Sequence, residues 1–151
     1  MRGLFGALAA SLALTAAASF PAQADGIDKE SIMQSLEMQG YSVSEFQPNM
    51  VAVEVGDFTI LVGVFGPDSD ISYVTYPTGV TANEVSYKFL SNFNRDVKFG
   101  RAYIDRDGDV TLQMDRNASG GISIRNIESD FDVFLLLVDK FMNDISRTGS
   151  V

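Results

Sequence analysis

The sequence predicts an α+β domain in which an antiparallel β-sheet is covered by helices on one side. Segments rich in β-branched and aromatic residues, divided by turn signals, fill residues 41–76 and 99–114. Segments with helical periodicity precede, separate and follow these two regions. Hairpin-sized loops and the lack of a repeated βαβ unit favour antiparallel pairing. The expected order is therefore α-β-β-β-β-α-β-β-α.

The first 24 residues have the organisation of a cleavable secretory signal. Arg2 precedes an apolar run from Leu4 to Ala18, and Ala22-Gln23-Ala24 forms an Ala-x-Ala cleavage box. The apolar run has about fifteen residues, whereas a membrane-spanning helix needs roughly 20. We expect cleavage between Ala24 and Asp25, a periplasmic or secreted location, and no membrane insertion after cleavage. The remaining residues, 25–151, suit a single domain.

The composition argues against several classes of function. The chain has 20 acidic and 11 basic residues, and no Cys or His. Removal of Arg2 with the signal would leave ten basic residues and a formal net charge of −10. Such a surface repels nucleic acid, so no nucleic-acid partner is expected. The lack of Cys excludes thiolate catalysis. The lack of His removes the side chain that most often serves as a general base or a metal ligand. We expect no cofactor.

Helix and strand signals locate the first half of the predicted domain. Asp28 is a suitable N-cap for a helix over residues 28–39, and Gly40 is a suitable residue to follow its end. Turn signals stand at Pro48-Asn49, Gly56-Asp57 and Gly66-Pro67-Asp68, and apolar residues alternate with other residues in the segments between these turns. The predicted strands span residues 41–46, 50–55, 58–65 and 71–76.

The second half is predicted to contain two further helices and a hairpin. A capping box at Thr81-Ala82-Asn83-Glu84 predicts a helix start, and an apolar stripe continues from Val85 to Val97. Strands over residues 99–105 and 109–114 flank the turn Arg106-Asp107-Gly108. An apolar repeat at three- and four-residue steps from Ile124 to Ile145 predicts a long final helix.

The hairpin carries a family resemblance. The run Phe99-Gly100-Arg101-Ala102-Tyr103-Ile104-Asp105, followed by Asp107-Gly108-Asp109-Val110, resembles the YbjN family of bacterial sensory transduction regulators. Gly40-Tyr41-Ser42-Val43 resembles the family's opening. The resemblance implies a fold similar to type III secretion chaperones, which are usually dimers that bind other polypeptides. It implies no catalytic residue.

Two charged groups are candidates for binding. Asp105, Asp107 and Asp109 lie on one turn, as calcium ligands can, but the spacing of an EF-hand loop is absent, so a solvated hairpin is the expected structure. Whether this turn binds a cation is left open. Arg101 lies within a predicted strand and could hold an anionic ligand or a partner's carboxylate. Surface pairing with nearby acids is the ordinary alternative.

The final helix has a second apolar set beside its core stripe. Spacing at 100° per residue places Val133, Leu136 and Leu137 toward the side opposite the stripe that contains Phe131 and Phe134. Exposure of all three would be costly, so a cover is expected. The cover could be the first helix, a second subunit or another polypeptide.

These observations favour a non-enzymatic exported protein that binds another polypeptide, or itself as a homodimer, in a chaperone-like or regulatory role. A small-ligand binding or sensing module, using the sheet face near Arg101, is the alternative. A hydrolase that uses carboxylates is a third hypothesis, because acids are plentiful although no Gly-x-Ser-x-Gly elbow is present.

Overall fold

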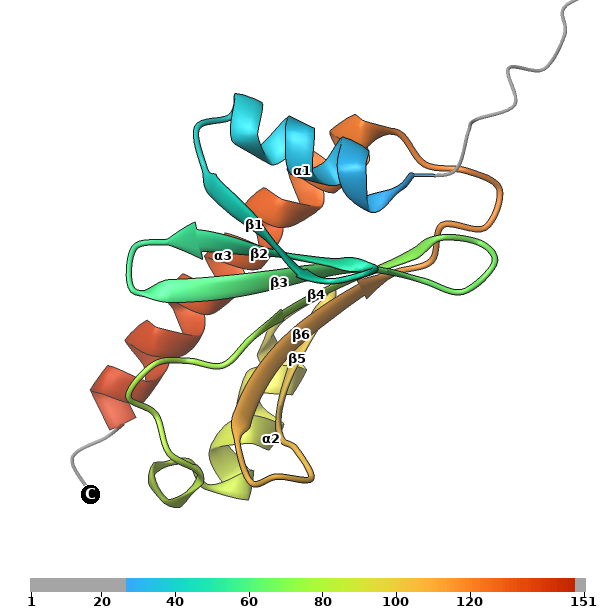
Figure 1. Cartoon of the computed structure of the whole chain (residues 1–151). Coiled ribbons are helices and arrows are strands. Elements are labelled where there is room, and N and C mark those ends of the chain that lie inside the picture. Colours follow the sequence, from blue (N-terminus) through green and yellow to red (C-terminus); the bar gives the residue numbers. More distant parts are fainter. Residues whose placement is uncertain (1–26, 149–151) are drawn as a thin grey trace, which may run out of the picture.

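A computed structural model of the chain describes residues 27–148 and confirms the predicted α+β class and element order (Figure 1). The predicted secretory signal and its cleavage site lie outside the described residues. The elements are α1 (Lys29–Met38), β1 (Ser42–Gln47), β2 (Met50–Val55), β3 (Phe58–Phe65), β4 (Asp70–Thr75), the 3₁₀ turn η1 (Ala82–Glu84), α2 (Tyr87–Asp96), β5 (Gly100–Ile104), β6 (Val110–Arg116) and α3 (Ile124–Thr148). Every neighbouring pair of strands is antiparallel, in the order β1-β2-β3-β4-β6-β5.

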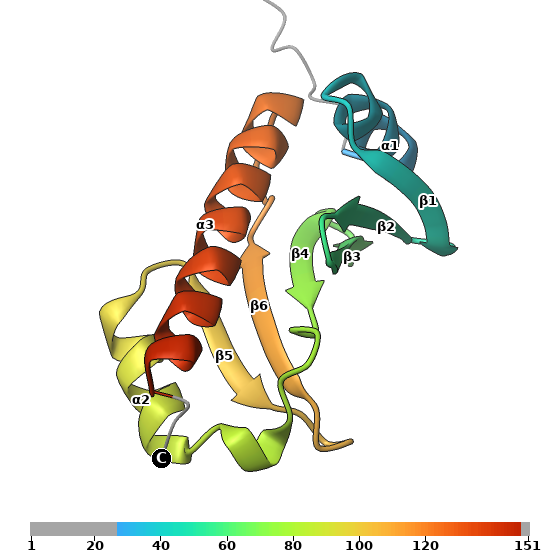
Figure 2. The same cartoon turned by 90° about the vertical axis from the view of Figure 1, so that its left-hand side faces the viewer.

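The helices cover one face of a strongly twisted sheet. Figure 2 shows α2 and α3 on the same side of β4, β6 and β5, while the opposite side of these strands carries no helix. Alternate residues of the strands face the helices and are buried, because side chains along a strand point to opposite faces. The core joins these residues to the apolar face of α3, in a cluster that includes Val53, Ile60, Tyr73, Leu112, Phe131, Phe134 and Phe141. We call the helix-free side the open face.

The first helix begins and packs as its sequence predicts. The Asp28 carboxylate accepts a hydrogen bond from the backbone N–H of Ser31 at 2.8 Å, which satisfies one of the free donors at the helix start. Ile32 and Leu36 are fully buried against the core. On the same helix, the Ser35 hydroxyl donates to Glu128 at 2.6 Å and so ties α1 to α3. Among the described residues, no helix is both long enough and apolar enough to cross a membrane.

The predicted start of the second helix is wrong by several residues. Thr81 and Glu84 do form the capping box, but it opens only the short turn η1, and Val85 already has extended backbone angles. The α-helix begins after Ser86, whose hydroxyl accepts from the backbone N–H of Phe89 at 3.1 Å. Two polar caps therefore precede the same apolar stripe, and α2 starts at the second cap.

Candidate interaction surface

The structure separates the three aliphatic residues that the sequence grouped on the final helix. Leu137 is only 9% exposed and packs over Gly100, where its Cδ1 atom lies 2.5 Å from the position that a Cβ atom on Gly100 would take. Val133 is partly buried against the core. Leu136 is 69% exposed. A strand of the same chain thus covers Leu137, and Leu136 lies uncovered among the described residues.

Phe99 stands just before β5 in an unusual backbone conformation. Its φ angle is +69°, and the backbone N–H of Gly100 donates to the carbonyl of Lys98 at 2.9 Å, which closes a γ-turn centred on Phe99. A bulky residue in this region of backbone space is strained by about 1–3 kcal/mol. The aromatic ring is nevertheless 78% exposed, so burial of the ring does not offset the strain.

Phe99, the end of β6 and the middle of α3 enclose a cavity of about 430 Å³, which we call the notch. Its lining includes Phe99, Met114, Asp115, Arg116, Asp130 and Val133. The lining therefore combines apolar side chains, such as those of Phe99 and Val133, with charged ones. A cavity of this volume is at the small end of those that hold ligands, and it has room for one large side chain.

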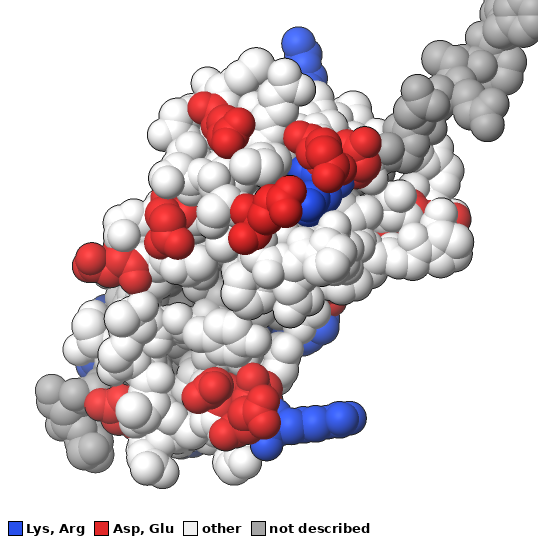
Figure 3. Space-filling view, viewed as in Figure 1, with Lys and Arg blue, Asp and Glu red and all other residues white. Residues whose placement is uncertain are grey.

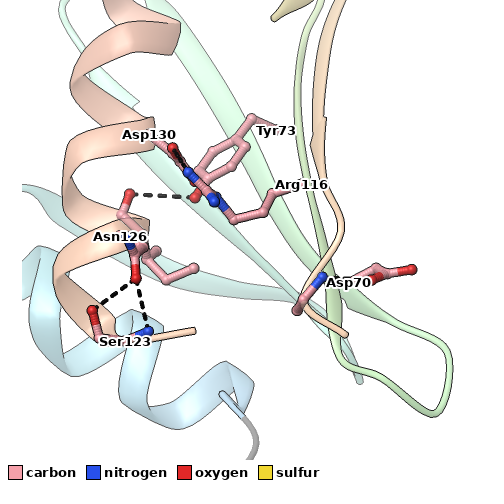
Figure 4. Close-up of polar contacts among 8 residues, drawn as sticks. Asp70, Tyr73, Arg116, Ser123, Asn126 and Asp130 are labelled. Atoms are coloured by element: carbon pink, nitrogen blue, oxygen red, sulfur yellow. Dashed lines mark hydrogen bonds and ion pairs between the residues drawn. The ribbon is translucent and has the colours of Figure 1, made fainter. Parts of the chain in front are cut away.

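The polar side of the notch is fixed by a cluster that joins the sheet to α3. Arg116 donates to both carboxylate oxygens of Asp130, and the Tyr73 hydroxyl donates to the carbonyl of Ile127 at 3.3 Å (Figure 4). The hydrogen bonds that Arg116 donates to Asp130 raise the pKa of Arg116, and burial raises the pKa of Tyr73 well above its ordinary range. The hydrogen bonds of Arg116 and Tyr73 tie β6 and β4 to α3 at this wall of the notch.

The free edge of β5 is occupied by a side chain of α2. The Asn94 amide donates to the carbonyl of Ala102 at 2.9 Å and accepts from the N–H of the same residue at 2.7 Å. This amide imitates the backbone of a neighbouring strand. Edge strands need such protection because their unpaired groups invite association with other chains.

Arg101 belongs to a hydrogen-bonded network on the open face, outside the core. Its guanidinium lies 2.9 Å from Asp115, and the Asp115 carboxylate also accepts from Ser72 at 2.7 Å and from Gln113 at 2.8 Å. The Tyr103 hydroxyl donates to Gln113 at 2.6 Å. Burial alone would raise the pKa of Asp115, but the hydrogen bonds and the charge of Arg101 outweigh burial, so this pKa is lowered. Asp115 is therefore an ionised anchor for its neighbours.

The open face has a shallow hollow next to this network. About 500 Å³ is enclosed by residues of β3, β4 and β6, including Phe65, Ser72, Val74 and Gln113. Figure 3 views this side and shows acidic side chains scattered over it, with a largely uncharged zone between them and no continuous basic area. The hollow is open, its lining also includes the charged residues Asp70, Asp115 and Arg116, and Ser72, Gln113 and Asp115 hydrogen-bond to one another.

The acidic hairpin is organised around Asp105. One oxygen of its carboxylate accepts from the backbone N–H groups of Asp107 and Asp109, at 3.0 and 2.9 Å. The backbone N–H of Gly108, which has a φ of +91°, closes the turn onto the carbonyl of Asp105. Within residues 27–148 no group of three acidic side chains is arranged as metal ligands.

The sequence does not indicate the roles of Phe99, which lines the notch, and of Asn94, which covers the edge of β5. Phe99 was assigned to a strand, and nothing in its neighbourhood signals a positive φ, because turns of this kind usually carry Gly. Asn94 lies within the segment that carries the predicted apolar stripe, and nothing in the local sequence marks its amide as a partner for a strand. Helical spacing places Val133, Leu136 and Leu137 together, whereas the structure buries Leu137 and exposes Leu136.

The comparisons with known proteins agree with the resemblance of the hairpin. The family model of YbjN, described as "Putative bacterial sensory transduction regulator", matches residues 22–147. No curated protein matches the chain. Because the match extends over most of the 151 residues, the chain belongs to the YbjN family.

Proposed function

We propose that this YbjN-family protein is exported, cleaved after Ala24, and acts without catalysis by binding another polypeptide. The observation that carries the proposal is the notch with its exposed apolar rim. Phe99, which lines the notch, is largely exposed, and so is Leu136, which follows the lining residue Val133 by three positions on α3. Large exposed apolar side chains beside a cavity are typical of sites where proteins bind partners.

The strain at Phe99 supports a role in binding over a role in folding. A Gly at this position would adopt the same φ without steric cost, and removal of the exposed ring would take little burial away from the folded state. The free protein therefore gains little from a Phe here. A partner that covers the ring would gain apolar burial worth about 25 cal/mol per Å².

Three of the acidic groups are stabilised in their charged form. Asp28, Glu84 and Asp115 have lowered pKa values, each mainly because hydrogen bonds stabilise the charged form. A carboxyl that serves as the general acid of a hydrolase needs a raised pKa. These three groups are thus suited to holding structure.

The test uses two variants that alter the rim without removing core residues. Phe99→Gly relieves the backbone strain and removes the ring, and Leu136→Asp places a charge at an exposed position. We expect both proteins to keep the melting temperature of the parent within a few degrees, while affinity capture from periplasm followed by mass spectrometry loses the partner that the parent protein retains. Lys88→Ala, an exposed position on α2, is the matched control. Equal capture by the parent, control and rim variants would contradict the proposal.

Export itself is tested separately. Intact mass of the protein from the periplasm should correspond to a chain that begins at Asp25. A different N-terminus, or recovery of the full-length chain from the cytoplasm, would contradict that part of the proposal.

A small-ligand sensing role is the second candidate, and the hollow on the open face favours it. Its polar groups are anchored by Arg101 and Asp115, and Phe65 supplies an apolar wall. Because the network is already hydrogen-bonded internally, a ligand would have to replace existing contacts. A panel of small carboxylates in a thermal-shift assay tests this candidate, and stabilisation that disappears in Arg101→Ala would favour it over polypeptide binding.

A further inference from the structure

The open face carries apolar side chains that do not belong to the core. The strand register places Ala52, Leu61 and Val74 side by side on β2, β3 and β4. Their neighbours along each strand are core residues, so the alternation of side chains turns these three away from α3. Ala52 and Leu61 are nearly buried, because the larger side chains around them shield them. The accessible part of this surface is therefore formed by those larger side chains.

Aromatic side chains stand at both ends of this surface. A Cβ atom on Gly63 would lie 2.5 Å from the Phe65 ring and 2.9 Å from Cγ of Met50, so both side chains lie over the glycine. Phe65 is 42% exposed, and Tyr76, which follows Val74 by two positions, is 48% exposed. Exposed aromatic side chains in one apolar area are typical of binding sites. We call the following residues the apolar band: Met50, Ala52, Leu61, Phe65, Val74 and Tyr76.

The sheet offers no backbone groups to an occupant of the apolar band. Strands β3 and β4 lie inside the sheet, and each is paired with a neighbour on both sides. Their N–H and C=O groups are used in these ladders, so this face presents side chains only. An extended segment laid across it would leave its own backbone groups without partners, whereas a helix pairs them internally. The apolar band therefore suits an amphipathic helix.

Two acidic side chains lie at opposite ends of the apolar band. Glu54 is exposed and faces the same way as Ala52, two positions before it on β2. Asp70 is opposite Phe65 in the register and lines the hollow. Neither acid has an ion-pair partner within residues 27–148. Figure 3 shows acidic side chains around the uncharged zone of this side.

The spacing of the two acids indicates the length of the helix. Glu54 is opposite Thr59, and Asp70 is opposite Phe65, so the acids are separated by six positions along β3 and by two strands. With about 3.3 Å per residue and about 4.8 Å between strands, this separation is on the order of 22 Å. A helix of about 15 residues has this length. Basic residues near both of its ends would meet Glu54 and Asp70.

A second copy of this chain is a poor source of such a helix. The apolar faces of α1, α2 and α3 are already buried in the core of the same chain. The whole chain carries a net charge of −9, so a second copy would bring like charge to an acidic face. The basic side chain on this face, Arg101, is already paired with Asp115. The charges therefore favour a different, basic polypeptide.

We propose that the apolar band binds an amphipathic helix of a partner polypeptide, with an apolar stripe over Leu61 and Val74. Lys or Arg near the two ends of the helix contacts Glu54 and Asp70. The notch is bordered by α3, whereas the apolar band lies on the side of the sheet that carries no helix. The inference thus goes beyond the proposed function and adds a second binding surface.

The test is an NMR titration of the ¹⁵N-labelled exported protein with the synthetic peptide acetyl-KKLAQLLQALQQLLKK-amide. All Leu residues of this probe fall on one side of a helix, and Lys stands at both ends. One control peptide has the same composition and ends, with Leu spread around the helix, and another has Glu in place of every Lys. We expect the probe to shift the amide signals of residues 61, 63 and 74 and to gain helical circular dichroism. Each control peptide should bind at least about tenfold more weakly, a loss of 1.4 kcal/mol.

The protein side is tested by two pairs of variants at exposed positions. Tyr76→Ser removes an aromatic ring from the apolar band, and Tyr87→Ser removes one from α2. Glu54→Lys and Glu37→Lys change the net charge equally, on the open face and on α1. We expect all four proteins to keep the melting temperature of the parent within a few degrees. Tyr76→Ser and Glu54→Lys should each bind the probe at least about threefold more weakly than the matched control.

Three outcomes would overturn the inference: no binding of the probe at millimolar concentration, equal binding of the peptide with scattered Leu, and equal binding by Tyr76→Ser and Tyr87→Ser. Phe99→Gly and Leu136→Asp should bind the probe as the parent does. If these two variants lose the captured partner but the probe does not bind the parent, the helix site is wrong and the proposed function stands. If sedimentation shows a dimer that Tyr76→Ser dissociates, a second copy covers the apolar band and the choice of partner is wrong.

Discussion

Removal of the Asn94 amide should destabilise the domain and open the edge of β5. In Asn94→Ala, both hydrogen bonds to Ala102 are lost while the backbone of α2 is unchanged. The N–H and C=O of Ala102 would then depend on water, and Ala102 itself is almost completely buried. The substitution therefore tests whether a side chain completes the sheet as a strand would.

The expected magnitude follows from two opposing effects. Each hydrogen bond contributes about 0.5–1.5 kcal/mol, so the pair contributes about 1–3 kcal/mol. Ala is a better helix former than Asn by roughly 0.5 kcal/mol, which offsets part of the loss. We expect the free energy of unfolding to fall by about 1–2 kcal/mol, a decrease of several degrees in melting temperature for a domain of this size.

The assays are urea unfolding, amide hydrogen exchange and sedimentation velocity. Ser91→Ala, at an exposed position on the same helix, controls for helix propensity and should be neutral or slightly stabilising. In Asn94→Ala, the amide of Ala102 should exchange faster than in the parent, and concentration-dependent association should increase because an edge is exposed. Unchanged exchange at Ala102, with stability equal to that of the Ser91→Ala control, would refute the reasoning.

Three further predictions concern the sheet and its attachment to α3. Gly63→Ala should lower the free energy of unfolding by no more than about 1 kcal/mol in urea titrations, because the new Cβ would lie 2.5 Å from the ring of Phe65, a 42% exposed side chain that can move aside, and a second change of Phe65→Ala should recover part of the loss. Tyr73→Phe should cost about 1–2 kcal/mol in the same assay, since the carbonyl of Ile127 loses its buried donor. Because the pKa of Asp115 is lower in the folded than in the unfolded protein, its ionised form stabilises the folded state at pH values above the ordinary Asp pKa. This stabilisation is lost as the pH falls through the lower folded pKa. Asp115→Asn should therefore flatten the acid limb of a plot of stability against pH. An acid limb identical to that of the parent would show that Asp115 has no such role.

The sequence was sufficient to predict the layers because its periodicities are strong. The alternation of Val51, Val53 and Val55, and the repeat that includes Phe131, Phe134 and Phe141, reflect burial on one face, which dominates the energetics of folding. Short hairpin turns indicate that strands which follow each other in the sequence are also neighbours in the sheet. The pairing of β4 with β6, which places β5 at the edge, joins strands that are far apart in sequence, and local signals do not reveal it.

The candidate surface was less predictable because it depends on contacts between particular atoms. A helical wheel places Leu136 and Leu137 together, yet Leu137 finds cover only because Gly100 lacks a side chain. The strand prediction for Phe99 followed its β propensity, and the γ-turn overrode that propensity locally. Asn94 contacts a residue eight positions away, on a different element, so no helical pattern could indicate its role.

Two features that cost free energy in the isolated protein lie at Phe99. This residue has a positive φ where most other such positions in the described chain carry Gly. Its ring, which lines the notch, is also exposed to water. A partner polypeptide that covers the ring would bury it. Relief of the strain in Phe99→Gly should therefore leave a stable domain that binds its partner poorly, because the apolar half of the notch is removed.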